Sequence, residues 1–126
     1  MFAFSCTREV AFSDTDAAGV AHFSRILVFI EDAEHSWLRE QGFDLETQAW
    51  PRVKVEISYH KALTFGDRIE LRIHSVSVGN SSLTYHCDVR CEDELSAAAS
   101  FTVVRLGPKG DKCPFDEPER LRLTEE

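Results

Sequence analysis

The sequence has no apolar run close to the roughly 20 residues that a membrane-spanning helix requires, so we expect no membrane span. Its start, MFAFSCTREV, lacks the basic flank and the long apolar stretch of a secretory signal. It also contains no internal repeat, low-complexity segment or interior linker. These absences predict a cytoplasmic protein with a single domain over residues 1–126.

Positive charge is also scarce. Lysine and arginine number 14 against 22 aspartate and glutamate residues, which gives a formal net charge of −8. Nucleic-acid binding needs a strong positive field around the protein, so this balance argues against a nucleic-acid partner. The nearest approach to a basic patch comprises Arg52, Lys54, Lys61 and Arg68. Such residues most often form the solvated face of a sheet, but Lys54 and Lys61 are our candidate substrate-binding residues for phosphate groups.

Cysteine occurs at only four positions, Cys6, Cys87, Cys91 and Cys113. Their spacing has neither the close pairs of a zinc site nor the density of a disulfide scaffold. We therefore expect free thiols that pack as small hydrophobic side chains. The histidines form no metal-ligand motif such as His-Glu-x-x-His, so no metal site is predicted.

Hydrophobic periodicity predicts one strand, one long helix and four further strands. The first strand spans residues 2–12, a turn follows at 13–19, and the helix runs from 20 to 41, where Gly42 ends it. The later strands span residues 52–60, 68–78, 82–92 and 95–106. Short connections favour antiparallel neighbours, which predicts the α+β class, with a sheet packed against one helix.

Two local features of this pattern carry further expectations. The alternation of the strand from residue 68 slips by Val76 and Val78, which predicts a bulge or a strong bend. The tail from Gly107 has three prolines and many charges, so residues 107–126 are predicted to form a loosely packed C-terminal extension.

Two carboxylates, Asp14 and Asp16, stand in the segment DTDAAGVAHF just before the expected helix. One of them could cap the helix, since its oxygen would accept a backbone N–H and its charge would meet the positive end of the helix dipole. The alternative is an active site, in which helix amides hold a developing oxyanion while an acid attacks or activates water. A single cap leaves the second acid unexplained, and Gly19 lets the backbone approach a bound group.

The stretch FSDTDAAGVAHFSRILVFIEDAEHSWL, residues 12–38, resembles the motif of the hotdog-fold acyl-CoA thioesterases of the 4-hydroxybenzoyl-CoA thioesterase type. The family pattern is Asp-x-Asp-x-x-Gly-[Val/Ile], an aromatic residue, a helix with Phe-x-Glu-x-Ala, and a leucine. The matching positions are Asp14, Asp16, Gly19, Val20, Phe29, Glu31, Ala33 and Leu38. Further on, ALTFGDRIEL resembles the Gly-Asp turn before the family's third strand, and the resemblance covers roughly residues 4–106.

The resemblance implies a hotdog fold, in which a curved antiparallel five-stranded sheet wraps around one long central helix. It implies a homodimer or homotetramer with active sites between subunits at the helix N-terminus, and no metal or cofactor. Asp16 then attacks the thioester carbonyl or activates water, and Asp14 beside it orders the loop as part of the substrate-binding set. Backbone amides between Gly19 and Phe23 polarise the carbonyl, with Gly19 and Val20 shaping their approach.

Two positions depart from the family pattern. Residue 22 is His where relatives commonly have Tyr or another aromatic residue, and Phe23 stands where several carry His or a polar residue. His22 is a candidate general base, since histidine titrates near neutrality; alternatively, it packs or hydrogen-bonds in place of an aromatic ring. Phe23 is a candidate substrate-binding residue, because both positions shape the acyl pocket.

Two glutamates of the expected helix also need an explanation. Glu34 falls on the apolar stripe of the helix, so we expect a paired structural acid there, with a working carboxylate as the alternative. Glu31 lies at the edge of the stripe and is a candidate substrate-binding residue that supports the motif loop.

These observations predict an acyl-CoA thioesterase that acts on an aromatic or a short- or medium-chain acyl-CoA. Two alternatives stay open from the sequence. One is a hotdog dehydratase or an enzyme acting on an acyl carrier protein, and a dehydratase would need a suitably placed histidine with an acid on the helix. The other is a non-catalytic acyl-thioester-binding module, which would not require Asp16 to be ionisable.

Overall fold

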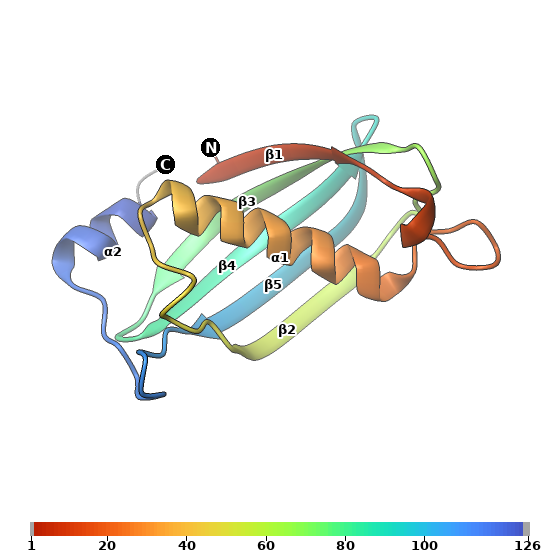
Figure 1. Cartoon of the computed structure of the whole chain (residues 1–126). Coiled ribbons are helices and arrows are strands. Elements are labelled where there is room, and N and C mark those ends of the chain that lie inside the picture. The colour runs from red at the N-terminus through yellow and green to blue at the C-terminus, as the bar shows by residue number, and fades with distance from the viewer. Residues whose placement is uncertain (1, 125–126) are drawn as a thin grey trace.

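A long helix lies along one face of an antiparallel sheet in the computed structural model, which describes residues 2–124 (Figure 1). The elements in chain order are β1 (Phe4–Glu9), η1 (Phe12–Asp14), α1 (Phe23–Glu40), β2 (Arg52–Tyr59), β3 (Arg68–Val78), β4 (Ser82–Cys91), β5 (Glu94–Val104) and α2 (Glu117–Thr124). The five strands follow the order β1-β3-β4-β5-β2, with every neighbouring pair antiparallel. The predicted α+β class is confirmed.

The core lies between α1 and the inner face of the sheet. From α1 the buried apolar residues are Ile26, Phe29, Ile30, Ala33, Trp37 and Leu38. From β3 and β4 they are Ile69, Leu71, Ile73, Leu83, Tyr85, Cys87 and Val89, at alternate positions along the strands. Each large apolar side chain contributes about 1.5–3 kcal/mol on burial, so this layer holds α1 firmly on the sheet.

All four cysteines are free thiols, as predicted. Cys87 lies in the core, and burial raises its pKa to about 12. Thiolate is the reactive form of cysteine, so this side chain serves packing rather than chemistry.

The helix begins three residues later than predicted, at Phe23 instead of residue 20. His22 is its N-cap, and the two preceding residues are held in bridges, Val20 with Thr64 and Ala21 with Thr15. The predicted end is confirmed, since Gly42 follows the C-cap with a φ of +91°. The amides of Gly42 and the next residue donate to the Arg39 and Leu38 carbonyls, a Schellman pattern that a glycine accommodates.

Three register shifts interrupt the pairing of the strands, and one of them falls between Val89 and Arg90 in the pairing of β4 with β5. In β3 the shift falls between His74 and Ser77, so the predicted bulge is confirmed. In β2 it falls between Arg52 and Lys54, where the sequence predicts strict alternation. That prediction is wrong for Arg52, because the irregularity turns its side chain inward toward α1 while Lys54 remains on the outer face.

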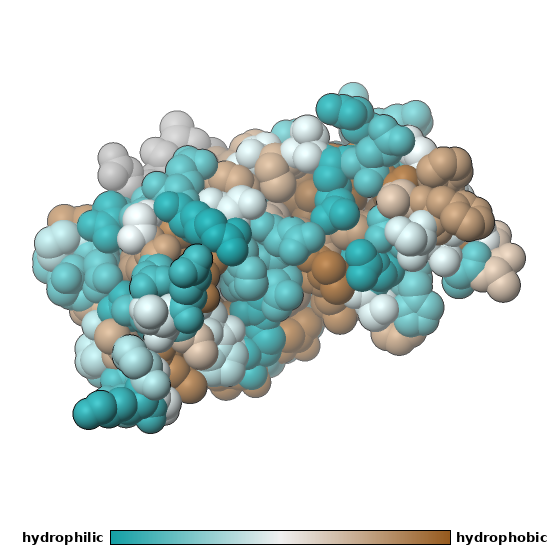
Figure 2. All heavy atoms as spheres, in the orientation of Figure 1, coloured by the Kyte–Doolittle hydropathy of each residue, from teal (hydrophilic) through white to brown (hydrophobic). Residues whose placement is uncertain are grey.

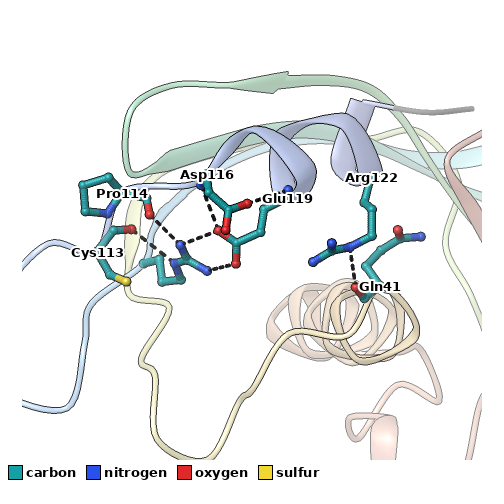
Figure 3. Close-up of polar contacts among 7 residues, drawn as sticks. Gln41, Cys113, Pro114, Asp116, Glu119 and Arg122 are labelled. Atoms are coloured by element: carbon teal, nitrogen blue, oxygen red, sulfur yellow. Dashed lines mark hydrogen bonds and ion pairs between the residues drawn. The ribbon is translucent and has the colours of Figure 1, made fainter.

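The tail is packed onto the domain, so the prediction of a loosely packed extension is wrong for residues 107–124. Leu123 of α2 is fully buried. The guanidinium of Arg105, at the end of the sheet, donates to the carbonyls of Cys113 and Pro114 and to both carboxylate oxygens of Glu119 (Figure 3). These bonds hold the pKa of Glu119 below its usual value. A buried guanidinium requires such partners, and the tail supplies them.

Candidate active site

The segment between η1 and α1 folds into a closed loop that carries Asp16 (Figure 1). The Asp16 amide donates to the Val20 carbonyl at 2.9 Å, and the Gly19 amide donates to the Asp16 carbonyl at 2.9 Å. Gly19 has a φ of +81°, a left-handed conformation that favours glycine. Oδ1 of Asp16 accepts the amides of Ala18 at 2.9 Å and Val20 at 3.3 Å. The side chain is thus exposed but oriented.

Asp14 has the opposite environment, since its side chain is 2% exposed. Its Oδ1 accepts a hydrogen bond from Nε of Arg25 at 2.9 Å and forms an ion pair with Nη2 at 2.9 Å, and its Oδ2 accepts the Ala11 amide at 2.8 Å. Its carbonyl accepts the His22 amide at 3.0 Å. The buried carboxylate is thus engaged within the loop, and substrate binding by Asp14 stays a prediction. Arg25 was missed from the sequence because an exposed basic residue on a helix carries no distinguishing signal.

Neither aspartate caps α1. His22 does so, because its Nδ1 accepts the Ser24 amide at 3.2 Å and lies 2.7 Å from the Ser24 hydroxyl. Its ring also stacks on Phe23, with centroids 4.5 Å apart. A neutral ring that accepts at Nδ1 carries its proton on Nε2, which donates rather than accepts. The hydrogen-bonding role expected of His22 is therefore observed, and its role as a general base stays a prediction.

Most of the amides expected to polarise a carbonyl are already engaged. Those of Gly19 and Val20 donate to Asp16, that of Ala21 donates to the Leu63 carbonyl at 2.7 Å, and that of His22 donates to Asp14. Within residues 2–124, the Phe23 N–H has no hydrogen-bond acceptor. Of the amides expected to polarise the carbonyl, that of Phe23 therefore has a free N–H within the described residues, at the positive end of the α1 dipole.

A groove of about 330 Å³ opens beside this amide, between the start of α1 and the end of β2. Its lining residues are Val20, Ala21, Phe23, Ile26, Tyr59, His60, Lys61, Ala62 and Leu63. Figure 2 shows apolar residues at the surface at this end of the molecule, where Phe23 is 61% exposed. The structure thus brings Val20, Phe23 and Lys61 together in the lining, whereas Asp16 is not a lining residue and is joined to the groove through its hydrogen bond from the Val20 amide.

Tyr59 is a further residue of the groove that the sequence did not single out. Its hydroxyl donates to the Phe23 carbonyl at 3.0 Å, and partial burial raises its pKa. Alternation in β2 marked it only as an apolar-face residue, and the hydrogen bond to the helix start depends on tertiary contact.

Arg52 joins the two glutamates of α1. It donates through Nη1 to Glu34 Oε2 at 2.8 Å and through Nη2 to Glu31 Oε2 at 2.9 Å. Glu34 is buried and also accepts the Tyr85 hydroxyl, so the expected paired structural acid is confirmed. Burial raises the pKa of Glu34 despite these partners. Glu31 contacts Arg52 rather than the motif loop, which corrects its expected supporting role.

Glu31 and Arg52 border a second groove, of about 190 Å³, farther along α1. Its other lining residues are Leu27, Val28, Val55 and Phe101. Lys54 is elsewhere: it pairs with Glu56 at 2.8 Å on the exposed surface of β2. The four basic residues noted in the sequence therefore do not form one patch, and only Lys61, paired with Glu94 at 3.1 Å, lies at the first groove.

Within residues 2–124, no group of three or more His, Cys, Asp or Glu side chains is placed to hold a metal ion. None of the helices in that range is long and apolar enough to cross a membrane.

Comparison with known proteins places this geometry in a family. A profile of the Thioesterase superfamily matches residues 18–98. The chain is 32% identical over 111 residues to a 1,4-dihydroxy-2-naphthoyl-CoA hydrolase of Crocosphaera subtropica, which covers 81% of each chain. It is 30% identical to the hydrolase of the same name from Rippkaea orientalis, over 94% of this chain and 95% of that one. A solved 1,4-dihydroxy-2-naphthoyl-CoA thioesterase from Synechocystis superposes with a TM-score of 0.84 at 24% identity, over 95% and 94% of the two chains.

The sheet that wraps around a single long helix is the hotdog fold, as predicted. The class of this protein is that of the thioester hydrolases. The chain belongs to the Thioesterase superfamily.

Proposed function

We propose that this protein hydrolyses an acyl-CoA thioester in the groove at the start of α1, with Asp16 as the nucleophile or general base. One observation carries the proposal. Oδ1 of Asp16 is fixed by the Ala18 and Val20 amides, whereas Oδ2 has no hydrogen-bond donor within the described chain, residues 2–124. Such a carboxylate has a fixed orientation because one oxygen is anchored. Its second oxygen is exposed and available to a ligand, because no group of the protein binds it.

The chemistry follows from the groups around this oxygen. In one route Oδ2 attacks the thioester carbonyl carbon, the C–S bond breaks, coenzyme A leaves as a thiolate, and water hydrolyses the resulting anhydride on Asp16. In the other route Oδ2 takes a proton from water, which attacks the carbonyl directly. In both, the Phe23 N–H and the helix dipole stabilise the oxyanion, and one such donor is worth roughly 3–4 kcal/mol in the transition state.

The acyl group that we propose is aromatic. Phe23 and Tyr59 present ring surfaces to the groove, and flat rings favour offset or edge-on packing against other aromatic rings. The curated relatives named for 1,4-dihydroxy-2-naphthoyl-CoA support the same class. Lys61, at the rim, is the cation available to a phosphate of coenzyme A.

We further propose that the active protein is a homodimer, or a tetramer built from such dimers, joined along β2. This strand is at the edge of the sheet, and its apolar residues Val53 and Val55 are 64% and 40% exposed. An exposed apolar edge strand is a template for pairing with a second chain. Pairing there would bring a second subunit against both grooves, because Tyr59 and Val55 line them.

The deciding experiment is hydrolysis of a panel of aromatic and aliphatic acyl-CoAs by the wild type and by Asp16→Asn. We expect kcat to fall about 10²–10⁴-fold in the variant, the usual contribution of a positioned acid or base. The matched control is Asp32→Asn, an exposed aspartate on α1 that pairs with Arg8 and lies outside the loop; it should retain the wild-type rate. Equal rates for Asp16→Asn and the wild type would remove Asp16 from the chemistry.

Repeated turnover in oxygen-18-labelled water tests the anhydride route. Label entering the Asp16 carboxylate supports the anhydride, because base catalysis never places a water oxygen on Asp16. Label found only in the released acid is the result expected both of base catalysis and of water attacking the acyl carbon of the anhydride.

A further inference from the structure

We infer that Arg25 is a positioning residue for Asp16, acting through Asp14; this rests on the proposed role of Asp16. Arg25 is in the first turn of α1, and its side chain reaches back to the buried carboxylate of Asp14. Both Nε and Nη2 lie 2.9 Å from the same oxygen, Oδ1. Among residues 2–124, no hydrogen bond or ion pair joins the Arg25 side chain to Asp16, and Arg25 is not a lining residue of the groove, so we expect any influence on the reaction to pass through the loop.

Asp14, held by Arg25, in turn forms hydrogen bonds at both ends of the loop. Its Oδ2 holds the Ala11 amide at 2.8 Å, which fixes the entry from β1, and its carbonyl holds the His22 amide at 3.0 Å, which fixes the helix cap. Between these points the Thr15–Ala21 bridge closes the loop around Asp16. The carboxylate of Asp16 is therefore fixed relative to the Phe23 amide by a chain of contacts that begins at Arg25.

Removing the guanidinium leaves a buried carboxylate without its cation, and such a group gains solvent by moving outward. Outward movement of Asp14 releases the Ala11 and His22 amides together, because the same residue holds both. The distance between the reacting oxygen and the carbonyl site then varies. Misplacement of about 1 Å can reduce the rate of a positioned reaction about 100-fold.

The contact also requires arginine specifically. One planar guanidinium places Nε, as a hydrogen-bond donor, and Nη2, as an ion-pair partner, at the same oxygen, and the 40% exposure of the side chain leaves its outer edge open to solvent. A lysine keeps the charge but lacks the paired donors of the fork. The space left by Arg25→Ala is accessible from solvent, so guanidinium ion can enter it.

The test compares Arg25→Ala and Arg25→Lys with Arg8→Ala. Arg8 is a matched control, since its guanidinium also pairs with an aspartate, Asp32 of α1, at 3.0 Å, and that pair includes no residue of the loop. In Arg25→Ala we expect kcat to fall about 10- to 100-fold, with KM within about twofold of the wild type. Millimolar guanidinium ion should restore much of this loss, and Arg25→Lys should retain an intermediate kcat. Arg8→Ala should keep the wild-type kcat with and without guanidinium.

Amide hydrogen exchange over residues 15–22 supplies a readout independent of activity. Exchange should accelerate in Arg25→Ala and not in Arg8→Ala. Unchanged exchange, or accelerated exchange with wild-type kcat, would overturn the inference. A general loss of stability would lower activity without rescue by guanidinium, and that result also overturns it. If the wild type turned over no acyl-CoA, the proposed function would fail while the exchange experiment still decided whether Arg25 orders the loop.

Discussion

The two aspartates of the DTD segment differ in what touches their carboxylates. Both oxygens of Asp14 are in use, by Arg25 and by the Ala11 amide, and the side chain is buried. Asp16 is exposed and uses only Oδ1 in its own turn. The two identical side chains, two positions apart, are therefore suited to different roles. Asp14 fixes the loop backbone, and Asp16 can present an oxygen to a ligand.

His22 provides a test at the same scale, because its cap and its suggested chemistry need different atoms. His22→Asn retains an N-cap residue type but has no group that titrates near neutrality, whereas His22→Ala has neither property. We expect His22→Ala to lower the free energy of unfolding by about 0.5–2 kcal/mol and His22→Asn to lower it less, measured by urea denaturation.

The kinetic expectation for His22→Asn is a kcat close to that of the wild type, since Nδ1 of the native ring is engaged by the Ser24 amide. A loss in His22→Asn as large as that in Asp16→Asn would contradict this view and restore His22 as a general base.

At the scale of elements, β2 and α1 are joined by polar contacts as well as by apolar packing. The irregularity in β2 turns Arg52 inward, where it meets Glu31 and the buried Glu34. Tyr85 of β4 donates to the same Glu34 carboxylate. A buried charge with good partners fixes orientation more than it adds stability. This contact therefore sets how the middle of α1 sits on the sheet beside the second groove.

The raised pKa of Glu34 predicts a pH dependence of folding. Burial raises its pKa above the ordinary value of 4.5, so the folded state binds this proton more tightly than the unfolded state does. The contribution of Glu34 is then full below about pH 4.5 and is lost as pH rises through the folded-state pKa, at about 1.4 kcal/mol per unit of pKa difference. Urea unfolding of Glu34→Gln at several pH values should show that this decline has been removed.

Glu119 supplies the contrast, since the hydrogen bond from Arg105 lowers its pKa. Its contribution is present above the ordinary pKa of 4.5 and is lost as pH falls through the folded-state pKa. Glu119→Gln should therefore flatten the acid side of the stability profile and leave the higher-pH decline in place. If Glu34→Gln and Glu119→Gln altered the pH dependence of the free energy of unfolding in the same way, neither slope could be assigned to its glutamate.

The elements that could be predicted from the sequence are those with regular packing periods. Alternation in β4 and the apolar stripe of α1 determine which side chains enter the core, and Gly42 marks the helix end. The start of α1 could not be placed, because an aspartate is a stronger cap candidate than His22 and only tertiary contacts decide between them. The tail was misjudged because its composition suits a solvated segment, whereas Arg105, directly after the apolar pair Val103–Val104, requires the tail as its partner.

The candidate site divides in the same way. Asp16 and Gly19 were identified because their residue types and spacing match a local motif. Arg25 and Tyr59 were not, because their roles arise from contacts 11 and 36 positions away in the chain. Lys54 was wrongly grouped with Arg52, since one irregularity in β2 separates their faces.

At the scale of the whole molecule, the two ends of α1 have different tasks. The groove and Asp16 are at its start, while α2 lies beside its end, where Arg122 donates to the Gln41 carbonyl at 2.9 Å (Figures 1 and 3). Between the two ends runs the exposed edge of β2. At the end of α1 the contacts with α2 cover the helix. The proposed second subunit would therefore reach the grooves along the edge of β2.

A lysine at Val55 tests that arrangement. Val55 is 40% exposed on β2, and a charge buried there by a second subunit would lose its hydration without a partner. We expect Val55→Lys to sediment as a monomer at concentrations where the wild type is dimeric or larger, and to lose hydrolysis together with assembly. Leu121→Lys, which introduces the same charge at a 60% exposed position on α2, should change neither property. Assembly of Val55→Lys equal to that of the wild type would rule out pairing along β2, and a fully active wild-type monomer would show that each groove is complete within one chain.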